Sequence, residues 1–169
     1  MNKRLVIFIC LLVGLTLSLP LAAQDDTSPE PIPVSGSFNY TWEELAATIA
    51  GDTYVGDYSE DEIWVGDFEG TAVSPFLFVQ RPSGTIEAWL YTEFDGTVLG
   101  EYEGTFVMMA VYKAPSDSTE WHGEWIILNG TGELENLRGF GTAWGPGSSN
   151  EDDGIIDIYY SGEVYFVEP

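Results

Sequence analysis

The chain has 169 residues, in which 28 Asp and Glu outnumber five Lys and Arg, and its formal net charge at pH 7 is −23. A protein this negative repels nucleic acid and anionic lipid, so we exclude both as partners. Cys10 is the single cysteine, which excludes an internal disulfide and a cysteine-ligated metal site.

The N-terminus has the order of a secretory signal peptide. Lys3 and Arg4 precede an apolar run over 5–19, and small residues follow it up to Ala23. The run is shorter than the roughly 20 residues that a membrane-spanning helix needs. We predict cleavage after Ala23, which makes 1–23 a signal peptide and the mature protein secreted or periplasmic, with no membrane contact after cleavage. Loss of the two N-terminal cations takes the formal charge from −23 to −25.

A short lead-in follows the predicted signal peptide. Residues 24–34 combine Asp, Ser and Thr with three prolines, a composition that buries little apolar surface, and we expect this segment to be disordered. From residue 35 on, Gly, Pro, Asn and Asp clusters separate segments rich in aromatic and β-branched residues. This rhythm predicts a single all-β domain over 35–169.

Alternation of apolar and polar residues marks the strands. In 36–42, three rings alternate with Ser, Asn and Thr and therefore lie on one face. The same period of two runs through 64–70, 86–94, 121–127 and 156–166. Within the last of these, Gly162 is expected to form a bend or bulge.

A hairpin is predicted in the middle of the chain. Asp95-Gly96 lies between two apolar runs and suits a two-residue turn, so strands near 85–94 and 97–113 are expected to pair. The stretch 102–113 is apolar on both faces, which requires a cover on each side. We expect the barrel interior on one side and an outer layer or second subunit on the other, and so predict a homo-oligomer.

One segment departs from the β pattern. Thr41 and Glu44 match a capping box, an Ala-rich apolar run follows, and Gly51 ends it. This pattern predicts one short helix near 42–50. About seven to nine strands with so little helix favour a small antiparallel barrel or a two-sheet sandwich, because both protect sheet edges.

The segment G-T-G-E-L-E-N-L-R-G at 130–139 resembles a family of small bacterial proteins of unknown function, whose barrel is similar to the allene oxide cyclase and dirigent barrels. The resemblance implies an antiparallel barrel of about eight strands over roughly residue 35 onward. Relatives with this barrel hold small apolar molecules and often form trimers, so a small apolar ligand and a trimer are implied by analogy. No catalytic residue carries over. Leu134 and Leu137 are spaced to plug one barrel end.

The inward rings are the candidate ligand contacts. They either fill the core or line a pocket for one small molecule, and the alternation is compatible with both. Glu133 and Arg138 either pair with each other across the turn or reach a polar group of the ligand. The candidate ligand-binding residues are Tyr40, Trp64, Phe106, Trp121, Trp125, Glu133, Arg138 and Tyr160.

Catalytic motifs are sparse. His122 is the sole histidine and alternates with Glu120 and Glu124, which places it on a solvated face. The sequence has no nucleophile elbow, phosphate loop or zinc-binding pattern, so we expect neither a metal nor a cofactor. The acidic clusters at 57–62 and 150–153 lack a calcium-loop register and are interpreted as solvated loops.

Three functions follow from these observations. The first is an exported binder of a small apolar or aromatic molecule, which we favour because no catalytic group is required. The second is a secreted structural or self-associating barrel without a pocket. The third is a cyclase or isomerase by analogy with the barrel's relatives, which predicts a buried carboxyl with a raised pKa beside a tyrosine. The sequence favours a role without turnover.

Overall fold

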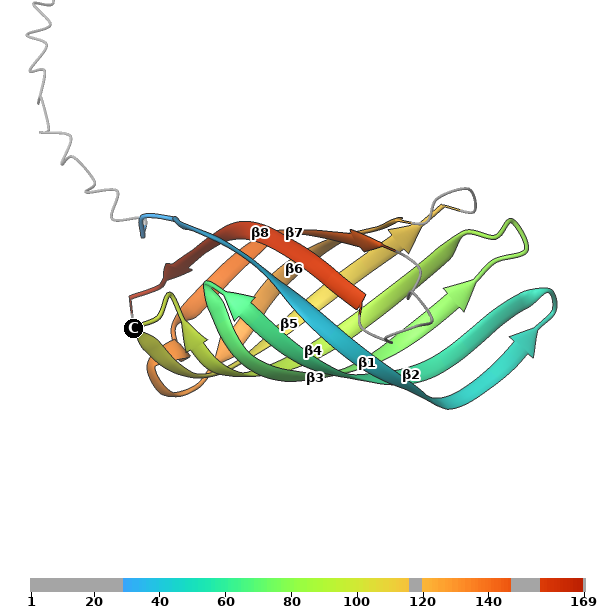
Figure 1. Cartoon of the computed structure of the whole chain (residues 1–169), viewed down its shortest axis with the longest axis horizontal. Helices are drawn as coiled ribbons and strands as arrows, with labels where there is room; N and C mark the ends of the chain where they lie inside the picture. Colours follow the sequence, from blue (N-terminus) through green and yellow to red (C-terminus); the bar gives the residue numbers. More distant parts are fainter. Residues whose placement is uncertain (1–28, 116–119, 147–155, 169) are drawn as a thin grey trace, which may run out of the picture.

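Eight antiparallel strands form a closed barrel (Figure 1). The computed structural model describes residues 29–115, 120–146 and 156–168. Each strand pairs with the next along the chain, and the last returns to pair with the first. The strands are β1 (Ile32–Ala50), β2 (Thr53–Gly66), β3 (Phe68–Gln80), β4 (Ile86–Val98), β5 (Tyr102–Ala114), β6 (Glu120–Gly130), β7 (Leu137–Pro146) and β8 (Ile156–Phe166), with a 3-10 helix η1 (Gly132–Leu134) before β7. The predicted all-β antiparallel barrel is confirmed.

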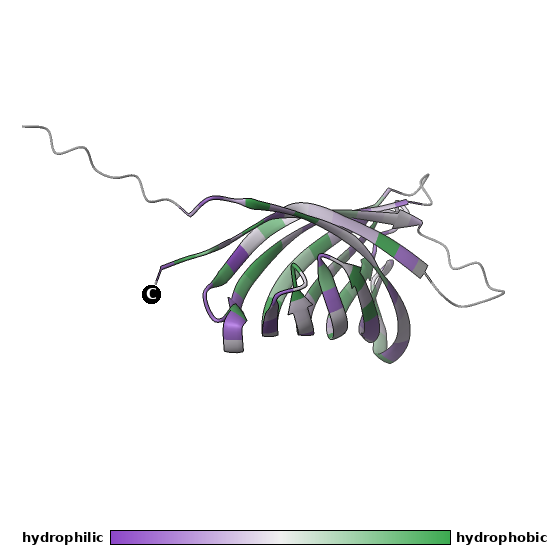
Figure 2. Ribbon diagram, turned by 60° about the vertical axis from the view of Figure 1, so that its left-hand side comes forward, coloured by the Kyte–Doolittle hydropathy of each residue, from purple (hydrophilic) through white to green (hydrophobic). Residues whose placement is uncertain are grey.

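Alternation along each strand sorts side chains between the lumen and the outer surface, and Figure 2 shows the resulting bands of hydrophobic and hydrophilic residues. Inside, Phe68, Phe94 and Phe106 are almost wholly buried. The rings of Phe94 and Phe106 stack with centroids 4.5 Å apart, and Phe68 stacks on Tyr160 at 4.9 Å. Burial of each such ring contributes about 1.5–3 kcal/mol, so these rings are a main source of stability.

The helix η1 and the start of β7 close one end of the barrel, here called the η1 end. Leu134 and Leu137 are fully buried there, which confirms the expected plug. Gly132 has φ +64°, a conformation that glycine adopts without strain. A Cβ on Gly104 would lie 2.2 Å from the carbonyl oxygen of Thr131, so β5 needs glycine where the plug crosses it.

The helix predicted near 42–50 is wrong, because this segment is the second half of β1. It pairs with β2, with Thr48 opposite Val55, and the register shifts between Glu44 and Ala46. Cross-strand hydrogen bonds to β2 therefore override the local helix propensity of the Ala-rich run. β1 also begins at Ile32, inside the segment expected to be a disordered lead-in.

The β4–β5 pairing is confirmed, but the predicted turn at Asp95-Gly96 is wrong. Both residues lie within β4, and the chain reverses at Leu99 and Gly100, which have φ of 57° and 67°. A Cβ on Gly96 would lie 2.2 Å from the carbonyl oxygen of Glu69, so this glycine serves the close approach of β3 and β4.

At the opposite end, the β1–β2 hairpin projects beyond the rest of the barrel (Figure 1). β8 pairs with β1 from Ile32 to Tyr40, and beyond Tyr40 the hairpin continues with β1 paired to β2. We call this the hairpin end. Within the described part of the chain, no helix has the length and hydropathy to span a bilayer.

Candidate functional site: a buried carboxyl cluster in the lumen

A polar cluster interrupts the apolar lumen. Glu60 and Glu62 occupy successive inward positions on β2, and Ser74 and Thr92 point inward from β3 and β4. All four are buried, and Glu62 is only 2% exposed. Carboxylates are seldom buried to this degree unless they are partnered. We refer to these four residues as the carboxyl cluster.

Hydrogen bonds tie the cluster together. Ser74 Oγ donates to Glu62 Oε1 at 2.5 Å, and Thr92 Oγ1 lies 2.7 Å from Ser74 Oγ. Because the single hydroxyl proton of Ser74 goes to Glu62, Thr92 is the donor to Ser74. Trp64 Nε1 donates to the other oxygen of Glu62 at 2.6 Å. Both oxygens of Glu62 therefore accept hydrogen bonds, which favours its charged form.

Glu60 and Glu62 hydrogen-bond to each other and divide the roles of acid and base. Burial, followed by the charge of Glu62 and the hydrogen bond to it, raises the pKa of Glu60 to about 9. Burial also raises the pKa of Glu62, but only to about 7, because Ser74, Trp64 and Glu60 stabilise its charge. Near neutral pH, Glu60 is thus the protonated partner, and the pair holds one titratable proton between pH 7 and 9.

The fixed cations of the described residues lie elsewhere. Arg81 and Lys113 both pair with Glu87 outside the barrel. Arg138 donates to the backbone carbonyls of Glu135 and Leu137. The carboxyl pair is therefore neutralised by a proton, and no arginine or lysine of the described chain supplies a counter-charge.

Two tyrosines flank the pair. Tyr40 lies opposite Glu62 in the β1–β2 register, and Tyr112 projects inward from β5. Burial, reinforced by the charges of the two glutamates, raises the pKa of both phenols. Both phenols are therefore neutral hydroxyl groups, available to donate or accept hydrogen bonds. Among the described residues, no three His, Cys, Asp or Glu side chains gather as a metal site.

Buried and half-buried rings cover the cluster at the hairpin end. Tyr58 stacks on Phe76 with centroids 5.0 Å apart. Phe78 on β3 meets Trp121 on β6 at 6.3 Å, and this contact crosses the lumen because β4 and β5 separate the two strands in the wall. The carboxyl cluster therefore lies between the aromatic core and a rim of rings.

The rim continues onto the projecting hairpin. Glu44 accepts hydrogen bonds from the hydroxyls of Tyr54 and Tyr58, at 2.5 and 2.8 Å. These bonds, that of Tyr54 first, lower the pKa of the Glu44 carboxyl. Acidic and phenolic groups thus extend from the exposed hairpin to the buried pair.

The aromatic candidates from the sequence all point into the barrel, but at different levels. Phe106, Trp125 and Tyr160 are packed in the aromatic core. Tyr40 and Trp121 are partly buried against that core. Trp64 connects the two levels, because its ring stacks on Phe38 at 4.3 Å while its Nε1 binds Glu62. The residues that reach the carboxyl cluster are Tyr40 and Trp64.

Glu133 and Arg138 lie outside this site. Glu133 Oε2 accepts a hydrogen bond from the backbone N–H of Glu103 at 2.8 Å, which holds η1 against β5. Arg138 binds backbone carbonyls at the start of β7. The two side chains do not pair with each other, because each hydrogen-bonds to backbone groups of the plug and its neighbours.

Glu60 and Glu62 were not identified from the sequence, because the acidic run 57–62 was interpreted as a solvated loop. The run 57–62 is instead part of β2, and its even positions face inward. The signal was the period of two that starts at Trp64, since counting back by two gives Glu62, Glu60 and Tyr58. The high density of acidic residues in 57–62 favoured a solvated loop, whereas the period of two indicated a strand.

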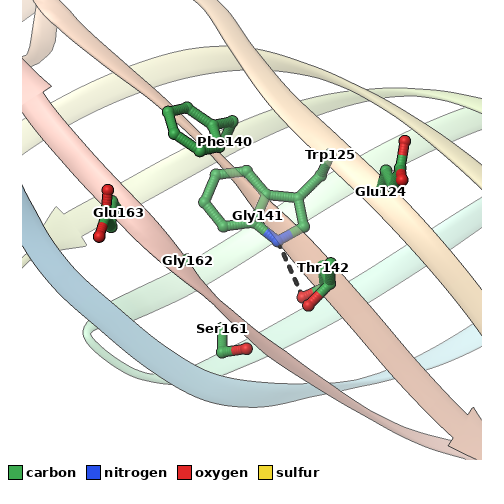
Figure 3. A pocket seen from close by; sticks show the side chains of 8 residues that line it. All are labelled: Glu124, Trp125, Phe140, Gly141, Thr142, Ser161, Gly162 and Glu163. Atoms are coloured by element: carbon green, nitrogen blue, oxygen red, sulfur yellow. Dashed lines mark hydrogen bonds between the residues drawn. The ribbon is translucent and has the colours of Figure 1, made fainter.

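A shallow groove lies on the outer surface across β6, β7 and β8 (Figure 3). Phe140, Ser161 and Glu163 contribute to its lining, and its floor is thin because Gly141 and Gly162 lack side chains. Behind them lies the ring of Trp125, whose Nε1 donates to the carbonyl of Thr142 at 3.1 Å. A Cβ on Gly162 would lie 2.5 Å from that ring, so Gly162 makes room for Trp125 within a regular β7–β8 register rather than forming the expected bulge.

Comparison with known proteins assigns the chain to a family. No curated protein matches it. A crystal structure of a protein of unknown function from the DUF3224 family of Shewanella oneidensis MR-1 is similar to it, with 20% identity and a TM-score of 0.63, over 83% of this chain and 100% of that one. That likeness concerns the fold. The family model described as "Protein of unknown function (DUF3224)" matches residues 34–150, and the chain belongs to this family.

Proposed function

We propose that the hairpin end of the barrel binds a small, mostly aromatic or apolar molecule whose hydrogen-bond donor meets Glu60 and Glu62. The observation that carries this proposal is the buried carboxyl pair, which lies behind half-buried rings and has no lysine or arginine beside it in the described chain. The polar groups at the rim, Glu44, Tyr54 and Tyr58, are one carboxylate and two phenols. The best-matched donor is therefore a protonated amine, which would replace the shared proton as the counter-charge.

The energetics support a role beyond packing. Each unit by which burial raises a carboxyl pKa corresponds to about 1.4 kcal/mol of penalty on the charged form. A solid barrel would be more stable with apolar side chains at both positions, since buried ionisable pairs often give way to hydrophobic residues with a gain of about 1–4 kcal/mol. Carboxyls with perturbed pKa values are enriched at binding and catalytic centres.

A second candidate is proton-transfer catalysis. Glu62 has a pKa of about 7, and a protonated Glu60 and the Tyr40 phenol lie beside it. A base poised near neutral pH next to an acid is the arrangement that general acid–base catalysis requires. The cyclase or isomerase alternative predicted such a carboxyl beside a tyrosine. Turnover of a bound molecule would distinguish this candidate from simple binding.

The proposal also includes a relation to other ligand-binding barrels and the export of the protein. The plug segment 130–139 supports a relation to the allene oxide cyclase and dirigent barrels, whose lumens hold apolar ligands. The basic and apolar N-terminal pattern supports export of the mature chain. An exported barrel would meet its ligand outside the cytoplasm.

Native mass spectrometry on the gently purified mature protein is the first test. We expect a small-molecule adduct, or stabilisation by members of a panel that pairs aromatic amines with neutral alcohols of the same shape. Calorimetry in buffers of different ionisation enthalpy should show proton release on amine binding near pH 8. The variant Glu60→Gln should abolish that release, because it removes the residue that holds the proton, whereas Glu93→Gln on the outer face should keep it.

Each component of the proposal can fail separately. An unmodified mass together with no stabilisation by any compound would contradict binding and leave the solid structural barrel. Binding of alcohols and amines alike, without proton release, would contradict the role given to the carboxyl pair. An N-terminus still at Met1 would contradict export.

A further inference from the structure

The outer surface of β4 to β7 carries an apolar face that the barrel itself does not cover. Direct register partners align Tyr91 with Met109, Met109 with Ile126, and Ile126 with Phe140. These four side chains are 43–55% exposed. The next row toward the hairpin end adds Trp89 and Val111, and we call these six residues the β4–β7 face.

On β1, by contrast, the outward positions in the barrel wall are Ser37, Asn39 and Thr41. Exposed apolar side chains also occur on β2, β3 and β8, but in the β4–β7 face direct register partners make a continuous row across four strands. A contiguous patch of this kind marks an interaction site.

We propose that the β4–β7 face packs against the same face of a second copy, around a two-fold axis that runs parallel to the strands between β5 and β6. Such an axis places β5 of one copy over β6 of the other and β4 over β7. Met109 then meets Ile126 of the second copy, and Tyr91 meets Phe140. Every apolar side chain of the central row is thereby covered by another, as a self-complementary interface requires.

The groove of Figure 3 provides the shape complement. Trp89, Val111, Glu124 and Thr142 form one register row across the four strands. The same axis therefore sets Trp89 of one copy over Thr142 of the second copy, beside the second copy's groove, which is floored by Gly141 and Gly162. An indole ring seated over bare backbone is the type of aromatic anchor that dominates interface energies.

Charge selects a second copy despite the acidity of the chain. Lys113 and His122 are register partners at the hairpin side of this face. The axis sets Lys113 over His122 of the second copy, next to Glu124, and it does so twice. Two Lys113–Glu124 contacts form at the borders of the apolar rows, where partial desolvation strengthens them. The long-range repulsion between two acidic chains is screened at physiological salt, where the Debye length is about 8 Å.

Sedimentation and light scattering of the mature protein at micromolar concentration in 0.15 M salt test this arrangement. We expect a dimer. Ile126→Glu should give a folded monomer, because it places a carboxylate in the central row. Ile63→Glu is the matched control, since Ile63 is similarly exposed at 56% but lies on β2 outside the face, and it should remain dimeric.

A charge exchange tests the axis itself. Lys113→Glu should weaken the dimer at least tenfold, and the double variant Lys113→Glu with Glu124→Lys should restore it. A monomeric wild type, a trimer, a dimer unaffected by Ile126→Glu, or a charge exchange without rescue would each overturn the proposal. Binding of the monomer to lipid vesicles or to another protein, in place of a second copy, would also overturn the proposal. These readouts do not involve the lumen, so they are independent of ligand binding.

Discussion

Glu60 and Glu62 lie two residues apart on the inner face of β2 and hydrogen-bond to each other inside the barrel. Their separation equals the period of a strand, so one β-strand presents both carboxyls on the same face. The two differ in surroundings, because Ser74 and Trp64 donate to Glu62. Unequal hydrogen bonding is what separates their pKa values.

The pair makes the fold sensitive to alkaline pH. Both carboxyls have a higher pKa in the folded protein than in the unfolded chain, where it is about 4.5. Below that value both states are protonated and the pair does not affect the pH dependence. As pH rises, the unfolded chain releases protons that the fold retains, so the free energy of unfolding falls, through about pH 7 for Glu62 and about pH 9 for Glu60.

Glu60→Gln should therefore stabilise the protein at alkaline pH. The amide that this substitution introduces still donates to Glu62 but has no proton to lose. At pH 8 we expect the free energy of unfolding to rise by about 1–4 kcal/mol, with little change at pH 4. Urea denaturation from pH 4 to 9 measures this, with the outward Glu93→Gln as control. Parallel pH profiles for the variant and the wild type would refute the buried, protonated state of Glu60.

Ser74 is the central link of the hydroxyl chain, so Ser74→Ala should be destabilising. The substitution leaves Thr92 without its acceptor and removes one donor from Glu62, at a cost of about 1–3 kcal/mol. It should also raise the pKa of Glu62, because Ser74 stabilises the charged form. Carboxyl carbon NMR reads that pKa directly.

Thr92→Val completes a double-mutant cycle with Ser74→Ala. The two hydroxyls bond to each other, so we expect the double variant to cost less than the sum of the single variants, by about 0.5–3 kcal/mol. Strict additivity in denaturant titrations would show that the two hydroxyls act independently, against the chain described above.

Tyr160 supports the core through its hydroxyl as well as its ring. Its oxygen accepts a hydrogen bond from the buried backbone N–H of Phe68 at 2.7 Å. Tyr160→Phe should therefore cost about 1–3 kcal/mol by leaving that N–H unpaired. Tyr159→Phe is the matched control, since Tyr159 is the next residue on β8 and is 44% exposed, and it should be near neutral. Equal melting temperatures for the two variants would contradict this role.

How far the sequence predicts the structure depends on how local the information is. The period of two in 36–42 and the plug leucines predicted the inner faces and the η1 end, because strand alternation and a one-turn spacing are local properties. The 42–50 segment failed because its pairing with β2 is not local, and no helix propensity reports it. The turn predicted at Gly96 was wrong for a similar reason, since the close contact of Gly96 is with Glu69 on another strand.

The candidate site was predictable only in part. The aromatic lining follows from periodicity, and Tyr40 and Trp64 were identified by it. Glu60 and Glu62 were not identified, because acidic residues in an acidic chain suggest solvent, and only the full length of β2 shows that they face inward. The hydrogen bonds that make their burial tolerable come from β3 and β4, which the sequence of β2 does not contain.

The plug provides a prediction that separates structure from function in the segment 130–139. Leu134→Ala should cost about 2–5 kcal/mol, because Leu134 is fully buried and its loss leaves a cavity beneath η1. Glu133→Gln should change stability far less, since the amide oxygen can still accept from the Glu103 N–H and the side chain is exposed. Thermal denaturation measures both. If Glu133→Gln instead abolished binding of a ligand at unchanged stability, the ligand would contact the η1 end, and the assignment of the site to the carboxyl cluster would be wrong.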